Sequence, residues 1–101
     1  MTITKIAEYF NASENTVRVH KHRLLLNNDD LLNEFDKRFN KAMICKEVIK
    51  DYKAKHLIHL FKSRSGAYNF YKKLNNMNKP CIIDKRFYNR CVKIIEHFEG
   101  V

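Results

Sequence analysis

Histidine and cysteine are the side chains of this sequence that could bind a metal ion or act as nucleophiles. His56 and His59 stand three residues apart and could share one face of a helix, a spacing that metal ligands often use. No cysteine is near them, and no acidic residue occurs between Asp51 and Asp84, so no ligand set is complete. We therefore expect no metal site and no cofactor.

The three cysteines, Cys45, Cys81 and Cys91, lack a C-x-x-C spacing and stand among apolar residues. Such cysteines are most simply small buried hydrophobes of a protein in a reducing, intracellular compartment. The chain also has no glycine-rich phosphate loop, no motif of paired carboxylates and no nucleophile beside a base. These absences argue against an enzyme.

The stretch SENTVRVHKHRLLL, residues 13–26, mixes basic and apolar residues at helical spacing. A helix-turn-helix needs a small residue in its first helix, a tight turn, and a second helix with an apolar inner face. Ala7 is the small residue, residues 11–13 are the turn, and the inner face holds Val17, His20 or Lys21, and Leu24. The outward positions are then Glu14, Asn15, Arg18, Val19, His22 and Arg23. A plain pair of amphipathic helices would give the same apolar face, so that alternative stays open.

A longer pattern runs from residue 6 to residue 24 and has the form I-A-x-x-L-x-I-S-x-x-T-V-x-x-H-x-x-x-I. The chain matches it at Ile6, Ala7, Ser13, Thr16, Val17 and His20, with apolar substitutes at Phe10, Ala12 and Leu24. The pattern resembles the helix-turn-helix of the LuxR/GerE group of bacterial response-regulator output domains and, more distantly, region four of sigma factors. The resemblance covers residues 3–26.

The resemblance implies that Thr16 touches a backbone phosphate and that Arg18, Val19 and His22 face base edges in the major groove. The chemistry of these side chains fits, because Arg offers two donors to guanine, Val contacts a thymine methyl, and His can donate or accept. The contacts expected from this helix are Asn15, Arg18, Val19 and His22 to base edges, and Thr16, Lys21 and Arg23 to phosphates.

The chain departs from that family outside the motif. Only five residues precede Ile6, and "LLNNDD" stands where the family has a Lys-Leu pair and a short dimerising helix. We therefore transfer the DNA-reading motif, and neither the whole fold nor the phosphorylation-driven switch. The layout is also similar to small phage and plasmid DNA-binding proteins, including small terminase subunits and partition or replication regulators.

The net charge of +9 lies in the second half of the chain. Residues 1–36 hold four Lys and Arg against six acids, whereas residues 37–93 hold sixteen against three. A solvated surface normally mixes charges, so this excess favours a polyanionic partner. We expect phosphate contacts from Lys62, Arg64, Lys72 and Lys73. The aromatic residues among them are expected in the core, and residues 65–74 are an alternative reading helix.

A length of 101 residues suits a single domain, here residues 1–27 as the helix-turn-helix and 28–101 as a basic helical remainder. With 2 Gly and 1 Pro, the fold is expected to be all-α, with five to six helices. Thr2 or Thr4 caps the first helix, and Ser13 caps a second that extends through Leu26. A third helix begins at residues 27–30, exceeds twenty residues and is expected to bend or break. Apolar residues at 57–61 and residues 67–74 mark two more, "SRSG" at 63–66 lies between them, residues 81–83 are extended, and Asp84 caps the last helix.

Together these features predict a sequence-specific double-stranded DNA-binding protein, a transcriptional or replication regulator of a phage or plasmid, acting as a cytoplasmic homodimer. No apolar run is long enough to span a bilayer, so no membrane association is expected. The alternatives are an RNA-polymerase-binding or other protein-interaction factor, and a small terminase-type DNA-packaging subunit.

Overall fold

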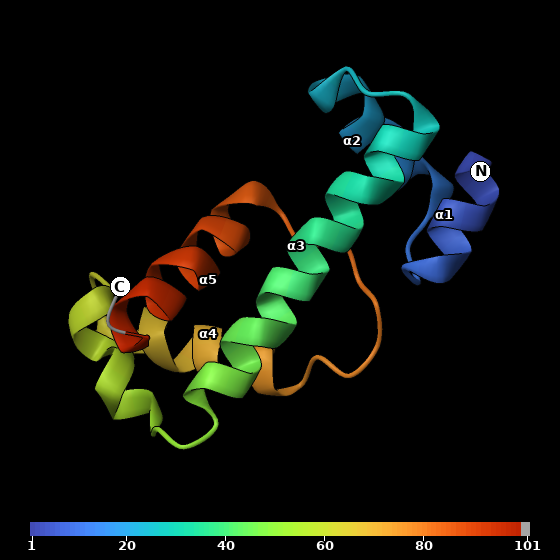
Figure 1. The fold of residues 1–101 in the computed structure, drawn as a ribbon. Coiled ribbons are helices and arrows are strands. Elements are labelled where there is room, and N and C mark those ends of the chain that lie inside the picture. Colours follow the sequence, from blue (N-terminus) through green and yellow to red (C-terminus); the bar gives the residue numbers. More distant parts are fainter. Residues whose placement is uncertain (100–101) are drawn as a thin grey trace.

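The computed structural model describes residues 1–99, and every regular element within this range is a helix. Figure 1 shows their arrangement. Five are α-helices and one is a 3-10 helix: α1 (Ile3–Tyr9), α2 (Glu14–Leu24), α3 (Asn28–Ile49), η1 (Ala54–Leu60), α4 (Arg64–Asn75) and α5 (Lys85–Phe98). The expectation of a small all-α domain with five to six helices is confirmed.

Helix α3 is the central element, and both halves of the molecule pack against it. Its 22 residues, about 33 Å at 1.5 Å per residue, extend along a molecule of 41 × 25 × 22 Å. Helices α1 and α2 pack on its first half, whereas η1, α4 and α5 gather around its second half (Figure 1). The helix is continuous from Asn28 to Ile49, so of the expected bend or break, the break is wrong. Burial along its whole length holds it together.

The apolar side chains form two buried clusters, one in each half. The N-terminal cluster joins α1 and α2 to the start of α3 and contains Ile6, Ala7, Phe10, Val17, Leu31 and Phe35. The C-terminal cluster joins the rest of α3 to η1, α4 and α5, with Ala42, Cys45, Leu57, Phe70, Phe87 and Ile94 among its members. Most of the aromatic residues of the basic half therefore pack in or against this cluster, as expected, although Tyr52 and Tyr68 are exposed.

Side-chain caps begin the α-helices at the positions that the sequence indicates. Thr2 caps α1, Asn27 caps α3, and the Asp84 carboxylate accepts from the Phe87 amide at 2.7 Å to begin α5. The Ser63 hydroxyl oxygen accepts from the Gly66 amide at 3.0 Å. Residues 64–66 are thus the first turn of α4 and not a break before it.

Two other boundaries differ from expectation. Helix α2 ends at Leu24, because Leu25 adopts a left-handed backbone conformation with φ 54°. Residues 54–60 form a 3-10 helix rather than an α-helix. Residues 81–83 pair with no strand among residues 1–99, but they join the two clusters: Ile82 packs on the N-terminal one and Ile83 lies in the other.

The helices within residues 1–99 include none with the length and apolar character that crossing a bilayer requires.

Candidate nucleic-acid interface

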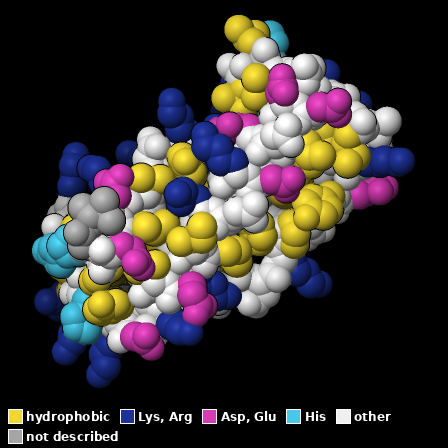
Figure 2. Space-filling model, in the orientation of Figure 1, with side chains coloured by type: hydrophobic (Ala, Val, Ile, Leu, Met, Phe, Trp, Pro, Cys, Tyr) yellow, Lys and Arg dark blue, Asp and Glu magenta, His cyan; other side chains and the backbone are white. Residues whose placement is uncertain are grey.

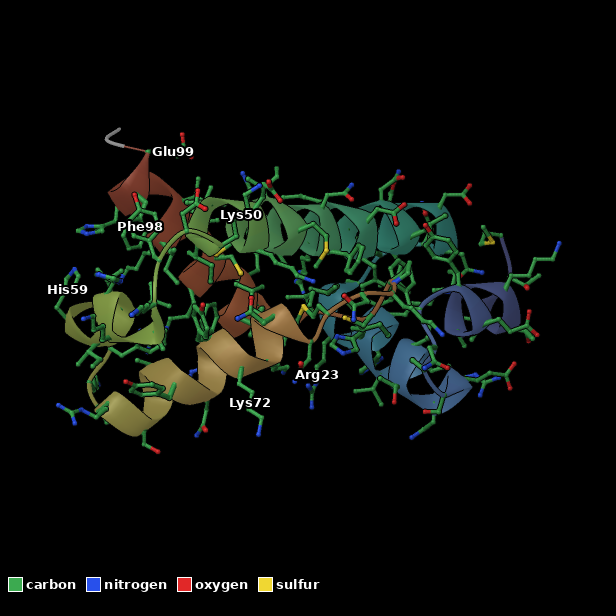
Figure 3. All side chains as sticks on the ribbon, turned by 90° about the horizontal axis from the view of Figure 1, so that it is seen from below. Arg23, Lys50, His59, Lys72, Phe98 and Glu99 are labelled. Carbon is green, nitrogen blue, oxygen red and sulfur yellow. The ribbon has the colours of Figure 1, made fainter. Side chains whose placement is uncertain are left out.

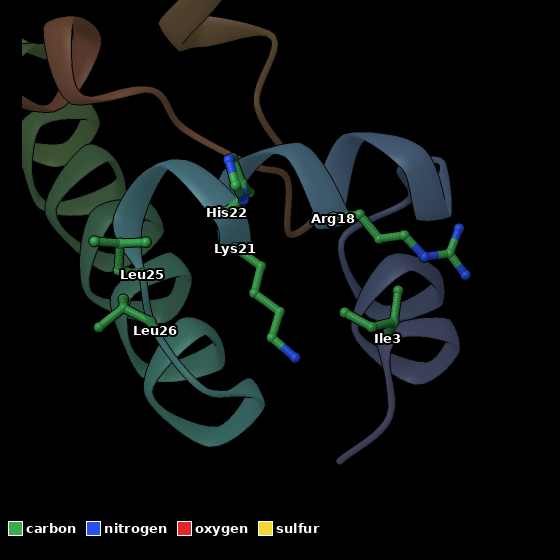
Figure 4. Close-up of a pocket in the computed structure, with 6 residues that line it drawn as sticks. All are labelled: Ile3, Arg18, Lys21, His22, Leu25 and Leu26. Carbon is green, nitrogen blue, oxygen red and sulfur yellow. The ribbon is translucent and has the colours of Figure 1, made fainter.

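Helices α1 and α2 are joined by a tight turn whose backbone is held by α1. The amide of Ala12 donates to the Ala7 carbonyl at 2.9 Å, and the amide of Phe10 donates to the Ile6 carbonyl at 3.1 Å. Between them Asn11 is left-handed, with φ 52°. Glycine is common in such turns, and Asn is among the residues that tolerate this conformation. The turn sends α2 across α1 rather than alongside it (Figure 4).

The start of α2 is fixed by side chains of both helices. The Ser13 hydroxyl oxygen accepts from the Thr16 amide at 3.1 Å, and the two hydroxyls lie 2.8 Å apart. The Thr4 hydroxyl donates to the Glu14 carboxylate and ties α1 to α2. Thr16, the expected phosphate contact, is exposed, and its hydroxyl is shared with Ser13.

The inner face of α2 is the one that the spacing predicts. Val17 is fully buried, and His20, Lys21 and Leu24 are half-buried. The ring of His20 meets the ring of Phe35 edge-on, with centroids 5.5 Å apart, and Phe35 also contacts Phe10. Burial lowers the pKa of His20, helped by the positive charges of Arg38 and Arg23 and opposed by Asp84. The second helix is therefore anchored on α3 as well as on α1.

The outer face of α2 presents the expected base-contacting residues to solvent. Its members, all exposed, are Asn15, Arg18, Val19 and His22. Val19 is 38% exposed although it is apolar, in contrast to Val17 at 0% two residues earlier. The same helix therefore has a sealed inner face and an outer face of mixed polar, cationic and apolar chemistry.

A hollow of about 440 Å³ lies at the end of this face, between α1, α2 and the residues that directly follow α2. It is lined by Ile3, Arg18, Lys21, His22, Leu25 and Leu26, and Figure 4 shows Lys21 extending into the space between Ile3 and the two leucines. Lys21 thus lies beside the exposed face rather than on it. Leu25 is 85% exposed.

The other expected phosphate contacts lie in the C-terminal half. Lys62, Arg64, Lys72 and Lys73 are all exposed, on α4 or just before it. Figure 3 shows α2 and α4 on the same side of α3, with Arg23 and Lys72 both extending from that side. The Lys73 ammonium lies over the Phe87 ring, 5.0 Å from its centroid, in a cation–π contact. The structure thus places cations of two distant segments on one side of the molecule.

Several cations of the basic half have internal partners that the sequence did not reveal. Arg38 is 3% exposed and binds Glu34 and the Ile83 carbonyl. The Lys46 ammonium donates to the Met77 carbonyl at 2.7 Å and to the side-chain oxygen of Asn78 at 3.1 Å. Only the spacing of Glu34 and Arg38, four residues apart, signals such a role in the sequence.

Arg90 is a further cation with an internal role. Its guanidinium donates to the Leu60 carbonyl at 3.0 Å and lies 4.4 Å from the Phe61 ring centroid. The basic excess is therefore partly structural. It includes fewer free cations than the sixteen Lys and Arg of residues 37–93 would suggest.

The cysteines and the two histidines of η1, the side chains that could bind a metal ion or act as nucleophiles, are at least partly buried or hydrogen-bonded within the fold. Cys45 and Cys91 are buried side by side between α3 and α5, and their hydrogen bond and burial raise the pKa of the Cys91 thiol. Burial also raises the pKa of Cys81. His56 and His59 do not pair, because the His56 Nδ1 accepts from the Lys53 amide at 2.8 Å while His59 faces His97. Among residues 1–99, no three or more His, Cys, Asp or Glu side chains form a metal-binding group.

Comparison of the chain with protein-family models, curated proteins and solved structures finds no match.

Proposed function

We propose that this protein binds double-stranded DNA in a sequence-specific manner through the outer face of α2. The observation that carries the proposal is the contrast within this helix: Val17 is sealed against α1 and α3, while Arg18, Val19 and His22 remain exposed. At 11 residues, α2 is about 16 Å long, enough to lie in a major groove about 12 Å wide. Asn15 would join these three as a base contact.

Phosphate contacts would orient the protein on the duplex. Thr16, Lys21 and Arg23 flank the outer face of α2, and Lys62, Arg64, Lys72 and Lys73 add positive charge from α4 and its approach. Arg23 and Lys72 extend from the same side of the molecule (Figure 3), which supports a contact surface formed by α2 and α4 together. By contrast, the face in Figure 2 carries acidic side chains among basic and apolar ones and is a poor surface for a polyanion.

The biological role that we propose is regulation of transcription or replication of a phage or plasmid. One reading helix supplies limited specificity, so we propose a homodimer that reads two half-sites. An alternative is a protein-interaction factor, for example one that binds RNA polymerase. Leu25, which is 85% exposed beside the hollow that Arg18 and His22 help to line, favours that alternative.

A salt-titrated duplex-binding measurement, after selection of bound fragments from a random DNA pool, tests the proposal. With about six phosphate contacts, the affinity should fall roughly a thousandfold between about 50 and 200 mM salt. The selected fragments should share a sequence, and a dimer should give two half-sites about one helical turn apart. Absent binding, or affinity that does not change with salt, would refute DNA binding, and fragments without a common sequence would refute specific reading.

A further inference from the structure

Two histidine side chains from distant segments face each other at the end of the molecule farthest from α1 and α2. His59 lies in η1 and His97 lies in the last turn of α5, 38 residues later. Their Nε2 atoms are 3.2 Å apart and their ring centroids are 5.0 Å apart. Figure 3 shows His59 at this end, and Figure 2 shows histidine side chains at the surface there.

These two distances are those of a pair of ligands on one metal ion. Two imidazoles bound to a tetrahedral zinc ion at about 2.0–2.1 Å have nitrogens about 3.3 Å apart and ring centroids about 5 Å apart. The pair in this protein has both values within a few tenths of an ångström. An ion bound to both nitrogens would replace the hydrogen bond between them, and it requires the two rings to point their lone pairs at one position.

The surrounding structure holds the two segments in place. Leu57 anchors η1 in the C-terminal cluster, and Ile94 anchors the last turns of α5 in the same cluster. Arg90 joins the two elements directly, since its guanidinium donates to the Leu60 carbonyl at 3.0 Å. Both histidines nevertheless remain exposed, so an ion can reach them from solvent. A site on packed helices with open access needs little reorganisation to bind.

We propose that His59 and His97 form a binding site for a divalent transition-metal ion of the zinc class. Imidazole nitrogens suit Zn²⁺, Ni²⁺ and Cu²⁺, whereas Mg²⁺ and Ca²⁺ prefer oxygen ligands. Among residues 1–99, no third His, Cys, Asp or Glu joins the pair, so this part of the chain supplies two ligands to the ion. By linking η1 to the end of α5, the bound ion stabilises the C-terminal half. This site is independent of the proposed DNA contacts.

Zinc titration of the full chain without a polyhistidine tag tests the site. Zn²⁺ should bind one ion per chain and raise the unfolding midpoint, and Mg²⁺ should do neither. His59→Ala and His97→Ala should each lower the Zn²⁺ affinity by at least about tenfold, the smallest loss typical even of groups that only orient a ligand, and should abolish the increase in midpoint.

His56→Ala is the matched control, because His56 is an exposed histidine of the same 3-10 helix whose Nδ1 is occupied by the Lys53 amide. This variant should keep the full Zn²⁺-dependent increase. Two-dimensional NMR should show zinc-induced shifts concentrated at His59 and His97. Loss of zinc binding in the control alone, or no binding in the parent, would overturn the site and leave a plain ring-to-ring hydrogen bond. One ion per two chains would overturn the single-chain site in favour of one shared between copies.

Discussion

The guanidinium of Arg38, in the middle of α3, donates through Nη1 to the carbonyl of Ile83 at 3.1 Å while its Nε donates to the Glu34 carboxylate. Ile82 and Ile83 pack on the two different clusters, so this contact fixes the loop segment where the two halves of the molecule meet. A buried cation with two acceptors, at 3% exposure, thus connects α3 to the segment directly before α5.

Replacement of Arg38 by Met should reduce the free energy of unfolding by about 2–4 kcal/mol. The change leaves the buried Ile83 carbonyl without this donor and leaves the half-buried Glu34 with only its longer ion pair to Lys37, and loss of one member of a buried pair is costly. Urea unfolding followed by circular dichroism measures it. Arg86→Met, at an exposed position of α5, should change stability by less than about 0.5 kcal/mol. Equal stability of the two variants would contradict the structural role of Arg38.

Leu25→Gly should stabilise the protein by about 0.5–1 kcal/mol. Leu25 follows the last residue of α2 with φ 54°, a conformation that is strained for a side chain with a Cβ and natural for glycine. Its side chain is 85% exposed, so little packing is lost. Asn11→Gly, at φ 52°, is the comparison, because Asn tolerates this conformation and should gain less. Thermal unfolding midpoints that fall for Leu25→Gly would show that the leucine makes contacts that outweigh the strain.

The helices of this protein can be predicted from the sequence, because a cap and an apolar spacing each depend on residues that are close together in the chain. Ser13 and Asp84 cap the helices for which the sequence predicts them, and Asn27 caps the helix that the sequence predicts to begin at residues 27–30. The end of α2 was not predictable in the same way. "LLL" continues an apolar pattern, and only the backbone conformation of Leu25 shows that the helix has ended.

The site was predictable on α2 but not beyond it. The alternation of buried Val17 with exposed Arg18 and Val19 follows from helical periodicity alone. By contrast, the roles of Lys46 and Arg90 depend on carbonyls 31 and 30 residues away, which no local pattern encodes. The shared side of α2 and α4 likewise depends on how both pack against α3.

Val17→Asp should destabilise the protein by several kcal/mol, because it puts an unpaired carboxylate into the N-terminal cluster at a position with 0% exposure. Val19→Asp introduces the same charge two residues later at 38% exposure and should leave the unfolding midpoint nearly unchanged. Thermal unfolding of both variants decides between the two faces. A Val17→Asp protein that melts with the parent would mean that α2 is rotated relative to the arrangement described.

The pH dependence of stability should reflect His20, whose pKa burial lowers from its ordinary value of 6.5. The unfolded chain takes up a proton near that value, while the folded chain resists protonation until a lower pH. Neutral His20 therefore makes its full contribution to the free energy of unfolding above pH 6.5, and this contribution is lost as the pH falls from there through the folded-state pKa.

His20→Gln should make the loss of stability below pH 6.5 shallower, as measured by urea unfolding across that range. His22→Gln removes an imidazole from an exposed position of the same helix and serves as the control. If both substitutions change the pH profile equally, the packing of His20 against Phe35 is not the source of the effect.

Base reading and phosphate contact can be separated by comparing Arg18→Ala with Lys72→Ala. Arg18 lies on the exposed face of α2, where loss of a two-donor contact to guanine should cost about 1–3 kcal/mol at one position of the selected sequence. Affinity for scrambled DNA should then change little. Lys72 extends from the same side of the molecule but from α4 (Figure 3), and its loss should weaken selected and scrambled DNA alike and reduce the salt dependence.

Both variants must be measured on selected and scrambled duplexes at several salt concentrations. Arg18 and Lys72 are exposed and belong to neither apolar cluster, so neither change should unfold the protein, and circular dichroism verifies this. If Arg18→Ala lowers both affinities equally, α2 supplies only positive charge. The reading helix would then be α4, where Ser65, Tyr68 and Asn69 are exposed beside Lys72, and Asn69→Ala should be the substitution that removes sequence preference.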